Sequence, residues 1–96
     1  MGRSVDPAHR GLLKLMLRLP SRRAELQRMW PDDLTFVSLC EAYDDATTTL
    51  ERMVVRPLPT DGLLVDEYRE ICADLEADVE RHCRFRASKA LSGKLP

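Results

Sequence analysis

Residues 36–53, "FVSLCEAYDDATTTLERM", decide the fold, because their apolar side chains recur at helical spacing. At 100° per residue, one narrow arc collects Phe36, Cys40, Tyr43, Thr47, Leu50 and Val54, with Leu39, Ala46 and Met53 along its edge. The charged side chains point elsewhere, namely Glu41, Asp44, Asp45 and Arg52. We therefore predict a helix with one buried face from about Leu34 to Val55, capped by Asp32 or Asp33.

A second long helix is predicted from about Leu63 to Arg86, around "VDEYREICADLEADVERH" at 65–82. Its apolar stripe spans roughly 80° of arc and contains Leu64, Tyr68, Ile71, Leu75, Val79 and His82. Cys72 and Cys83 lie together on one border of the stripe. These two thiols lie about 16 Å apart along a helix axis, too far for a disulfide or a shared metal ion.

The segment "RPLPTDG" at 56–62 separates the two helices. Pro57 and Pro59 cannot continue helical hydrogen bonding, and the Asp61–Gly62 pair suits a tight reversal. Two helices of this length joined by a short loop form an antiparallel hairpin. No period-two alternation appears, so the predicted fold is all-α, with a helical bundle expected on self-association.

The first thirty residues predict one or two short helices. Arg10, Lys14 and Arg18 form a basic stripe on a leucine-rich helix at 8–19, and Ser21 is the expected N-cap of a second piece ending near Trp30. This helix either folds onto the hairpin or binds something else. Folding would bury Leu12, Leu13, Met16 and Leu19. The predicted division is a basic helical segment at 1–31, the hairpin at 32–86 and a flexible basic tail at 87–96.

The two long helices resemble a family of small uncharacterised bacterial helical-hairpin proteins. The resemblance rests on a Phe–x–x–hydrophobic–Cys–x–x–Tyr run, followed by Glu-Tyr-Arg near the start of the next helix, and covers about residues 20–83. The matching positions are Phe36, Leu39, Cys40, Tyr43, Glu67, Tyr68 and Arg69. Ala42 departs from the acid expected before the tyrosine. The resemblance implies the hairpin fold and no particular activity.

Charge is strongly segregated along the chain, although 15 basic and 16 acidic residues nearly cancel. Residues 1–30 carry a net charge of +5, residues 31–82 carry −10, and residues 83–96 carry +4. Three cysteines without a CxxC spacing favour free thiols in a reducing, cytoplasmic setting. A chain of 96 residues forms one domain at most, and no stretch suits a transmembrane helix.

No residue pattern indicates catalysis, a cofactor or a metal site, so we expect a non-enzymatic protein. His82 and Cys83 are helix neighbours and therefore project about 100° apart, which is a poor arrangement for a nucleophile and its base. We expect His82 to face another helix. Cys40, Cys72 and Cys83 are expected to be structural, with Cys40 the most sensitive to substitution.

The combination of wide apolar stripes and separated charge favours a protein–protein interaction or scaffold module. The expected partner is a second copy of the chain or a different protein. A homodimer would share a core that includes Phe36, Tyr43, Leu50, Tyr68 and Leu75. The alternative is a nucleic-acid-binding protein that uses the basic N-terminal segment, although the acidic hairpin would repel phosphates.

Overall fold

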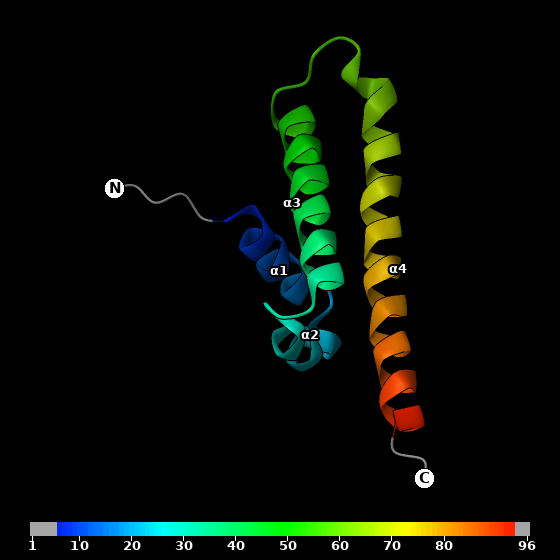
Figure 1. The fold of residues 1–96 in the computed structure, drawn as a ribbon. Helices are drawn as coiled ribbons and strands as arrows, with labels where there is room; N and C mark the ends of the chain where they lie inside the picture. The colour runs from blue at the N-terminus through cyan, green and yellow to red at the C-terminus, as the bar shows by residue number, and fades with distance from the viewer. Residues whose placement is uncertain (1–5, 94–96) are drawn as a thin grey trace, which may run out of the picture.

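The computed structural model describes residues 6–93, and the side chains of residues 6–90. Its elements are α1 (Pro7–Arg18), the 3-10 turn η1 (Pro20–Arg22), α2 (Arg23–Met29), α3 (Leu34–Val55) and α4 (Asp61–Gly93). The described part of the chain contains no strand, and α3 and α4 form an antiparallel hairpin (Figure 1). The predicted all-α hairpin with short N-terminal helices is confirmed.

Helix α3 has the predicted bounds, and the capping carboxylate is that of Asp33. Its Oδ1 accepts a hydrogen bond of 3.0 Å from the backbone N–H of Phe36. This bond satisfies one of the donors that the first turn of a helix leaves free. The helix ends at Val55, directly before the loop that contains Pro57 and Pro59.

Helix α4 is longer than predicted at both ends. Asp61 and Gly62 belong to its first turn, because the buried Asp61 carboxylate accepts a 2.7 Å bond from the backbone N–H of Leu58 and pairs with Arg52. That carboxylate stabilises the helix start, and the tight turn lies just before it, where the backbone N–H of Asp61 donates to the carbonyl of Leu58 at 2.9 Å. At the other end α4 continues through the first part of the predicted tail 87–96 to Gly93, and residues 94–96 lie outside the described chain.

The predicted N-cap at Ser21 is wrong. The backbone N–H of Arg22 donates to the carbonyl of Leu19, which makes Ser21 part of η1. An N-cap residue needs a non-helical conformation, and a residue inside a 3-10 turn does not have one. Helix α2 therefore begins at Arg23 without a side-chain cap.

Helix α1 packs across α3, and Gly11 is the residue that allows the close approach. A Cβ on Gly11 would overlap the backbone carbonyl of Cys40. The side chains of Leu12 and Leu15 are buried, whereas Leu13 is 44% exposed. The expectation that the leucine-rich helix folds onto the hairpin is thus confirmed, with Leu15 in the core position predicted for Leu13.

The buried face of α4 is displaced towards the predicted border of the stripe, because Cys72 and Cys83 are buried together with Val79 of the stripe. Leu64 and Ile71 remain 39% and 41% exposed. In this orientation the acidic side chains of α4 also meet basic groups of the N-terminal elements, with Glu76 beside Arg18 and Glu80 beside Arg22.

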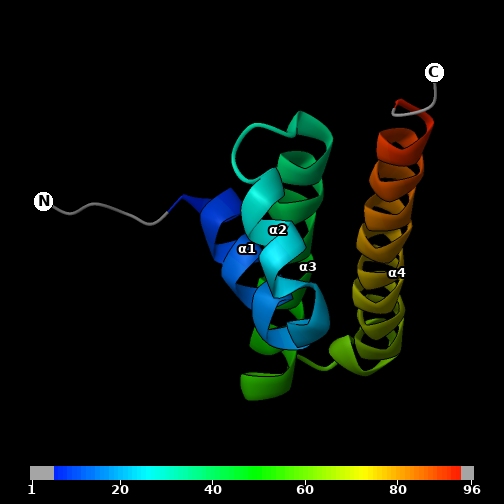
Figure 2. The same ribbon diagram turned by 90° about the horizontal axis from the view of Figure 1, so that it is seen from below.

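Figures 1 and 2 show the resulting arrangement from two directions. Helices α1 and α2 lie against the side of α3, and α4 stands at the edge of the molecule with one long side uncovered. None of the described helices has the length and apolar character needed to cross a membrane.

Candidate functional site

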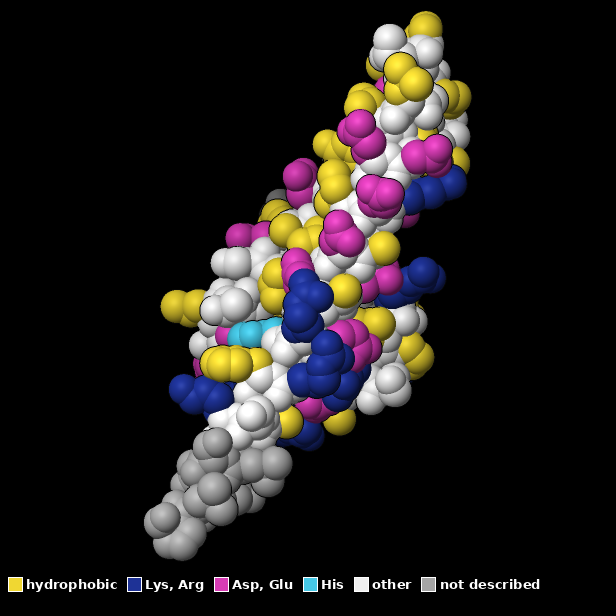
Figure 3. Space-filling model, turned by 90° about the vertical axis from the view of Figure 1, so that its right-hand side faces the viewer, with side chains coloured by type: hydrophobic (Ala, Val, Ile, Leu, Met, Phe, Trp, Pro, Cys, Tyr) yellow, Lys and Arg dark blue, Asp and Glu magenta, His cyan; other side chains and the backbone are white. Residues whose placement is uncertain are grey.

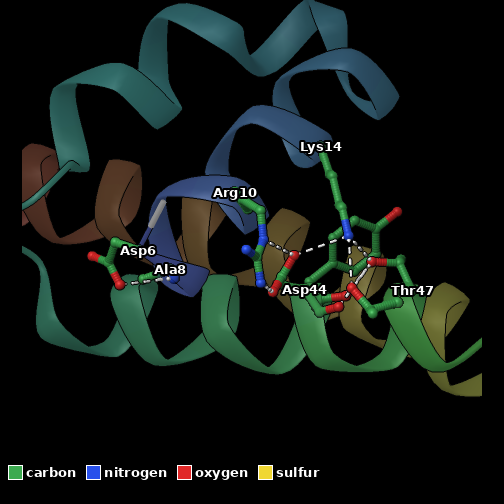
Figure 4. Close-up of polar contacts among 8 residues, drawn as sticks. Asp6, Ala8, Arg10, Lys14, Asp44 and Thr47 are labelled. Carbon is green, nitrogen blue, oxygen red and sulfur yellow. Dashed lines mark hydrogen bonds and ion pairs between the residues drawn. The ribbon is translucent and has the colours of Figure 1, made fainter. Parts of the chain in front are cut away.

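The basic stripe of α1 is bound to acidic groups of its own chain. Asp44 of α3 is buried, and its carboxylate accepts two hydrogen bonds from the guanidinium of Arg10, at 3.2 and 2.9 Å. The Lys14 Nζ lies 2.9 Å from the same carboxylate and donates to Thr47 at 2.8 Å (Figure 4). The Arg10 hydrogen bond outweighs burial and holds the Asp44 pKa below its usual value.

This arrangement corrects the orientation predicted for Asp44, which was expected to point away from the buried face. A carboxylate that accepts from a two-pronged guanidinium and an ammonium can be buried without an unpaired charge. The same helix shows a second difference, because Met53 is buried while Val54 is 54% exposed.

A second polar contact joins α1, α3 and α4 through Glu76. Its Oε2 accepts from the Tyr43 hydroxyl at 2.6 Å and from Arg18 Nε at 3.1 Å. Burial and the bond to Glu76 raise the Tyr43 pKa. One turn further along, Arg22 joins Glu80 and Glu25, each at 2.7 Å. The three cations of the basic stripe, Arg10, Lys14 and Arg18, therefore all contact acidic groups of the same chain.

Asp33 links the start of α3 to the second half of α4. One carboxylate oxygen lies 2.7 Å from His82 Nε2 and 2.7 Å from Arg86 Nη1, while the other caps Phe36. Burial alone would raise the Asp33 pKa, but these hydrogen bonds outweigh it and lower the pKa from 3.8 to about 2. His82 therefore faces another helix, as predicted.

All three thiols are free and buried. Burial raises the pKa of Cys40 to about 12 and raises the pKa of Cys72 and Cys83 above the ordinary value. A thiol with a raised pKa is a poor nucleophile at neutral pH. Among the described residues, no group of three or more His, Cys, Asp or Glu side chains is arranged to hold a metal ion.

The predicted interaction residues fall into two groups. Phe36 and Tyr43 are 0% and 4% exposed within one chain, so they have almost no area to offer a partner. Leu50, Tyr68 and Leu75 are half-buried and pack against the core from its edge. Their role in binding stays a prediction, and the structure leaves other apolar side chains far more accessible.

Three accessible apolar side chains of α4 lie in one row, whereas the more exposed Leu63 projects about 100° away from it. Leu64, Ile71 and Phe85 are 39%, 41% and 58% exposed, and together with Asp78 they are spaced seven residues apart. We call these four residues the α4 seam. The flanking side chains are charged, and they are Glu67, Asp74, Arg81 and Lys89. Phe85 is held in place by stacking on His82, with Lys89 over its ring.

The sequence prediction missed Phe85, although the seven-residue spacing from Leu64 and Ile71 was available as a signal. A depression of about 580 Å³ lies beside Phe85 and is lined also by Asp33, Leu34 and His82. Leu34 is 76% exposed at its edge. The seam therefore ends beside a shallow recess between the start of α3 and the second half of α4, and charged side chains line most of this recess.

Comparison with protein-family models, with curated proteins and with solved structures found no match to this chain. The resemblance to small helical-hairpin proteins accordingly stays a prediction. A function for the chain has to be inferred from its own geometry.

Proposed function

We propose that this chain is a non-enzymatic protein–protein interaction or scaffold module that binds through the α4 seam. The observation that carries the proposal is the row of exposed apolar side chains, Leu64, Ile71 and Phe85, along the uncovered side of a 33-residue helix. Single exposed apolar residues are common, but a row at heptad spacing is typical of helices that pack on another helix.

The surroundings of the seam favour a protein partner. Glu67, Asp74 and Arg81 border the apolar row on one side, and the half-buried Tyr68 and Leu75 border it on the other. The row thus has a polar rim along its outer edge, as protein interfaces do. Phe85 is an aromatic anchor of the kind that contributes strongly to binding energy. The first partner that we propose is a second copy of the chain, and an adaptor role towards a different protein is the other form of the same function.

The nucleic-acid alternative has less support. Arg10, Lys14 and Arg18 would have to leave Asp44 and Glu76 before they could bind phosphates. Removing the partners of a buried carboxylate is costly, because the charge is left without compensation. The strong acidic character of the hairpin adds repulsion over the whole approach.

The proposal of a non-enzymatic role is supported by the way the reactive groups are used. The three thiols have raised pKa values, and the histidine of α4 is paired with a helix cap. Free buried thiols also support a reducing, cytoplasmic location.

A photo-crosslinking amino acid placed at Ile71 tests the proposal inside the source cells. We expect crosslinks to protein from position 71 and from position 85. The matched control is position 38, where Ser38 is exposed on α3 away from the seam. Crosslinking that is absent at both seam positions, or equal at position 38, would remove the basis of the proposal.

A gel-shift experiment with mixed DNA and RNA tests the alternative. We expect no shifted band at about 0.15 M salt, where exposed charges are screened beyond about 8 Å. A salt-dependent shift that is weakened by replacing Arg10 or Lys14 would favour the nucleic-acid function instead.

A further inference from the structure

We infer that the α4 seam pairs with the seam of a second copy of this chain in antiparallel orientation, with Ile71 against Phe85 of the second copy. This inference rests on the proposed function and names its partner and geometry. The seam is long enough for such a contact, because residues 64–89 of a helix extend over about 38 Å. A step of seven residues returns to nearly the same side of a helix, so one neighbour can cover the whole row.

The direction follows from the charges of α4. Residues 61–80 carry eight acidic side chains and one basic one, whereas residues 81–90 carry four basic side chains and no acidic one. Figure 3 shows the acidic groups over the upper part of this side and basic groups over the lower part. Two parallel copies would place acid against acid, while antiparallel copies place acid against base.

The helix dipole does not explain this distribution by itself. Its influence is largely confined to the first and last turns, and the acidic run continues through Glu70 and Asp74 into the middle of α4. These two carboxylates and that of Glu67 form no ion pair with another described residue. They are therefore available to a neighbouring molecule.

The register follows from matching the apolar positions. A two-fold axis through Asp78 sets Ile71 opposite Phe85 of the second copy and Glu67 opposite Lys89 of the second copy. Each pair occurs twice, as an isologous interface requires. Asp78 at the axis is already paired with Arg81 in its own chain. The two Asp78 carboxylates that meet at the axis therefore each have a compensating positive charge.

No described element of the fold obstructs this approach. Helix α1 packs on α3, and α4 stands at the edge of the molecule with one long side uncovered (Figures 1 and 2). The seam side chains Leu64, Ile71 and Phe85 are exposed within the single chain. A contact made by one helix from each copy is smaller than a standard interface, so we expect dissociation in the micromolar range, about 1–100 µM.

Charge reversal with sedimentation equilibrium of the full chain tests the pairing. Glu67→Lys and Lys89→Glu alter exposed side chains and should leave the fold intact, which circular dichroism checks. Each variant alone should self-associate about tenfold more weakly than the wild type, since two attractions become two repulsions. An equimolar mixture of the two variants, and the double variant, should both recover wild-type association.

A cysteine at the axis tests the register independently of affinity. Asp78→Cys should form a disulfide-linked dimer under mild oxidation, because only a residue on the axis meets itself. The matched control is Asp66→Cys, at an exposed position away from the seam, which should form no disulfide-linked dimer. The native thiols are buried in both variants and should not react.

Three results would overturn the inference. A wild-type chain that stays monomeric at about 500 µM, well above the expected dissociation constant, excludes self-pairing. A dimer that is insensitive to both charge reversals, or equal linkage at positions 78 and 66, excludes this arrangement. If a monomeric chain still crosslinks to another protein from position 71, the proposed function stands and only the second copy is excluded.

Discussion

Helices α3 and α4 form one hairpin, yet they are covered very differently. The 22 residues of α3 are enclosed by α1 on one side and α4 on the other, and they include six buried side chains. The 33 residues of α4 include only four among those whose side chains are described, and none beyond Cys83. The comparison shows that the shorter helix is the centre of this fold and the longer one is its edge.

The difference divides the molecule into a helix whose apolar side chains form the core and a helix with accessible apolar side chains. A buried apolar face such as that of α3 is committed to the fold and has no area to offer a partner. A helix with one uncovered side keeps its second apolar row accessible. Substitutions in each helix test this difference. The largest loss in the free energy of unfolding is expected where α1 covers α3.

Gly11→Ala should remove the cover that α1 gives to α3. The added methyl group overlaps the backbone of Cys40, which cannot move away as a flexible side chain could. We expect a loss of about 3 kcal/mol in the free energy of unfolding, measured by urea denaturation.

The control is Gly62→Ala in the first turn of α4, where the added methyl group meets no atom within 4 Å. It should stabilise the chain by up to about 1 kcal/mol through helix propensity. Equal effects of the two substitutions would contradict the close contact between α1 and α3.

Asp33→Ala should loosen the second half of α4 from the start of α3. The substitution removes the helix cap and the acceptor of both His82 and Arg86. We expect a loss of about 2 kcal/mol in the free energy of unfolding, measured by urea denaturation. The neighbouring Asp32→Ala, which changes an exposed side chain, should cost less than about 0.5 kcal/mol. A similar loss of stability in both variants would mean that Asp33 is not the residue that caps α3.

Lowering the pH should weaken the contacts of Asp33 with His82 and Arg86 in the unsubstituted protein. The pKa of Asp33 is lowered from 3.8 to about 2, so its contribution is complete above pH 4 to 5 and is lost as the pH falls through 2. This carboxylate should account for about 2 kcal/mol of the loss between pH 5 and pH 2. The Asp33→Ala variant should show a correspondingly flatter decline in thermal denaturation. An identical pH dependence in both proteins would exclude Asp33 as its source.

Arg18→Ala should have the smallest effect, although Arg18 joins α1 to α4. Its side chain is 66% exposed, and solvent-exposed ion pairs contribute little. Glu76 also keeps its hydrogen bond from Tyr43. We expect a change below about 0.5 kcal/mol in urea denaturation, and a loss above about 2 kcal/mol would mean that this pair is essential to the edge position of α4.

Local signals in the sequence predict some parts of this fold well. The bounds of α3 follow from a capping aspartate at one end and a proline-rich loop at the other, and both act within a few residues. The hairpin follows from the lengths of two apolar stripes. Each of these features depends on neighbours in the chain, so no knowledge of tertiary contacts is needed.

Other parts depend on contacts between distant residues. The rotation of α4 about its axis depends on packing against distant parts of the chain, among them Arg18 and Arg22, each 58 positions away from its acidic partner. The periodicity within α4 contains no sign of these contacts. The burial of Asp44 likewise requires the cations of α1. Because the candidate seam is whatever the rotated helix leaves uncovered, it could be located only after that rotation was known.

The three buried thiols can each report a local opening of the fold. Cys40 belongs to α3, where its backbone is in close contact with Gly11 of α1, whereas Cys72 and Cys83 belong to α4 and lie beside Tyr43 of α3 and Met29 of α2. An alkylating reagent can reach each sulfur only when the neighbouring elements separate. The labelling rate of Cys40 therefore reports the opening of the core around α3, and those of Cys72 and Cys83 report the separation of α4 from its neighbours, in one protein and without a foreign probe.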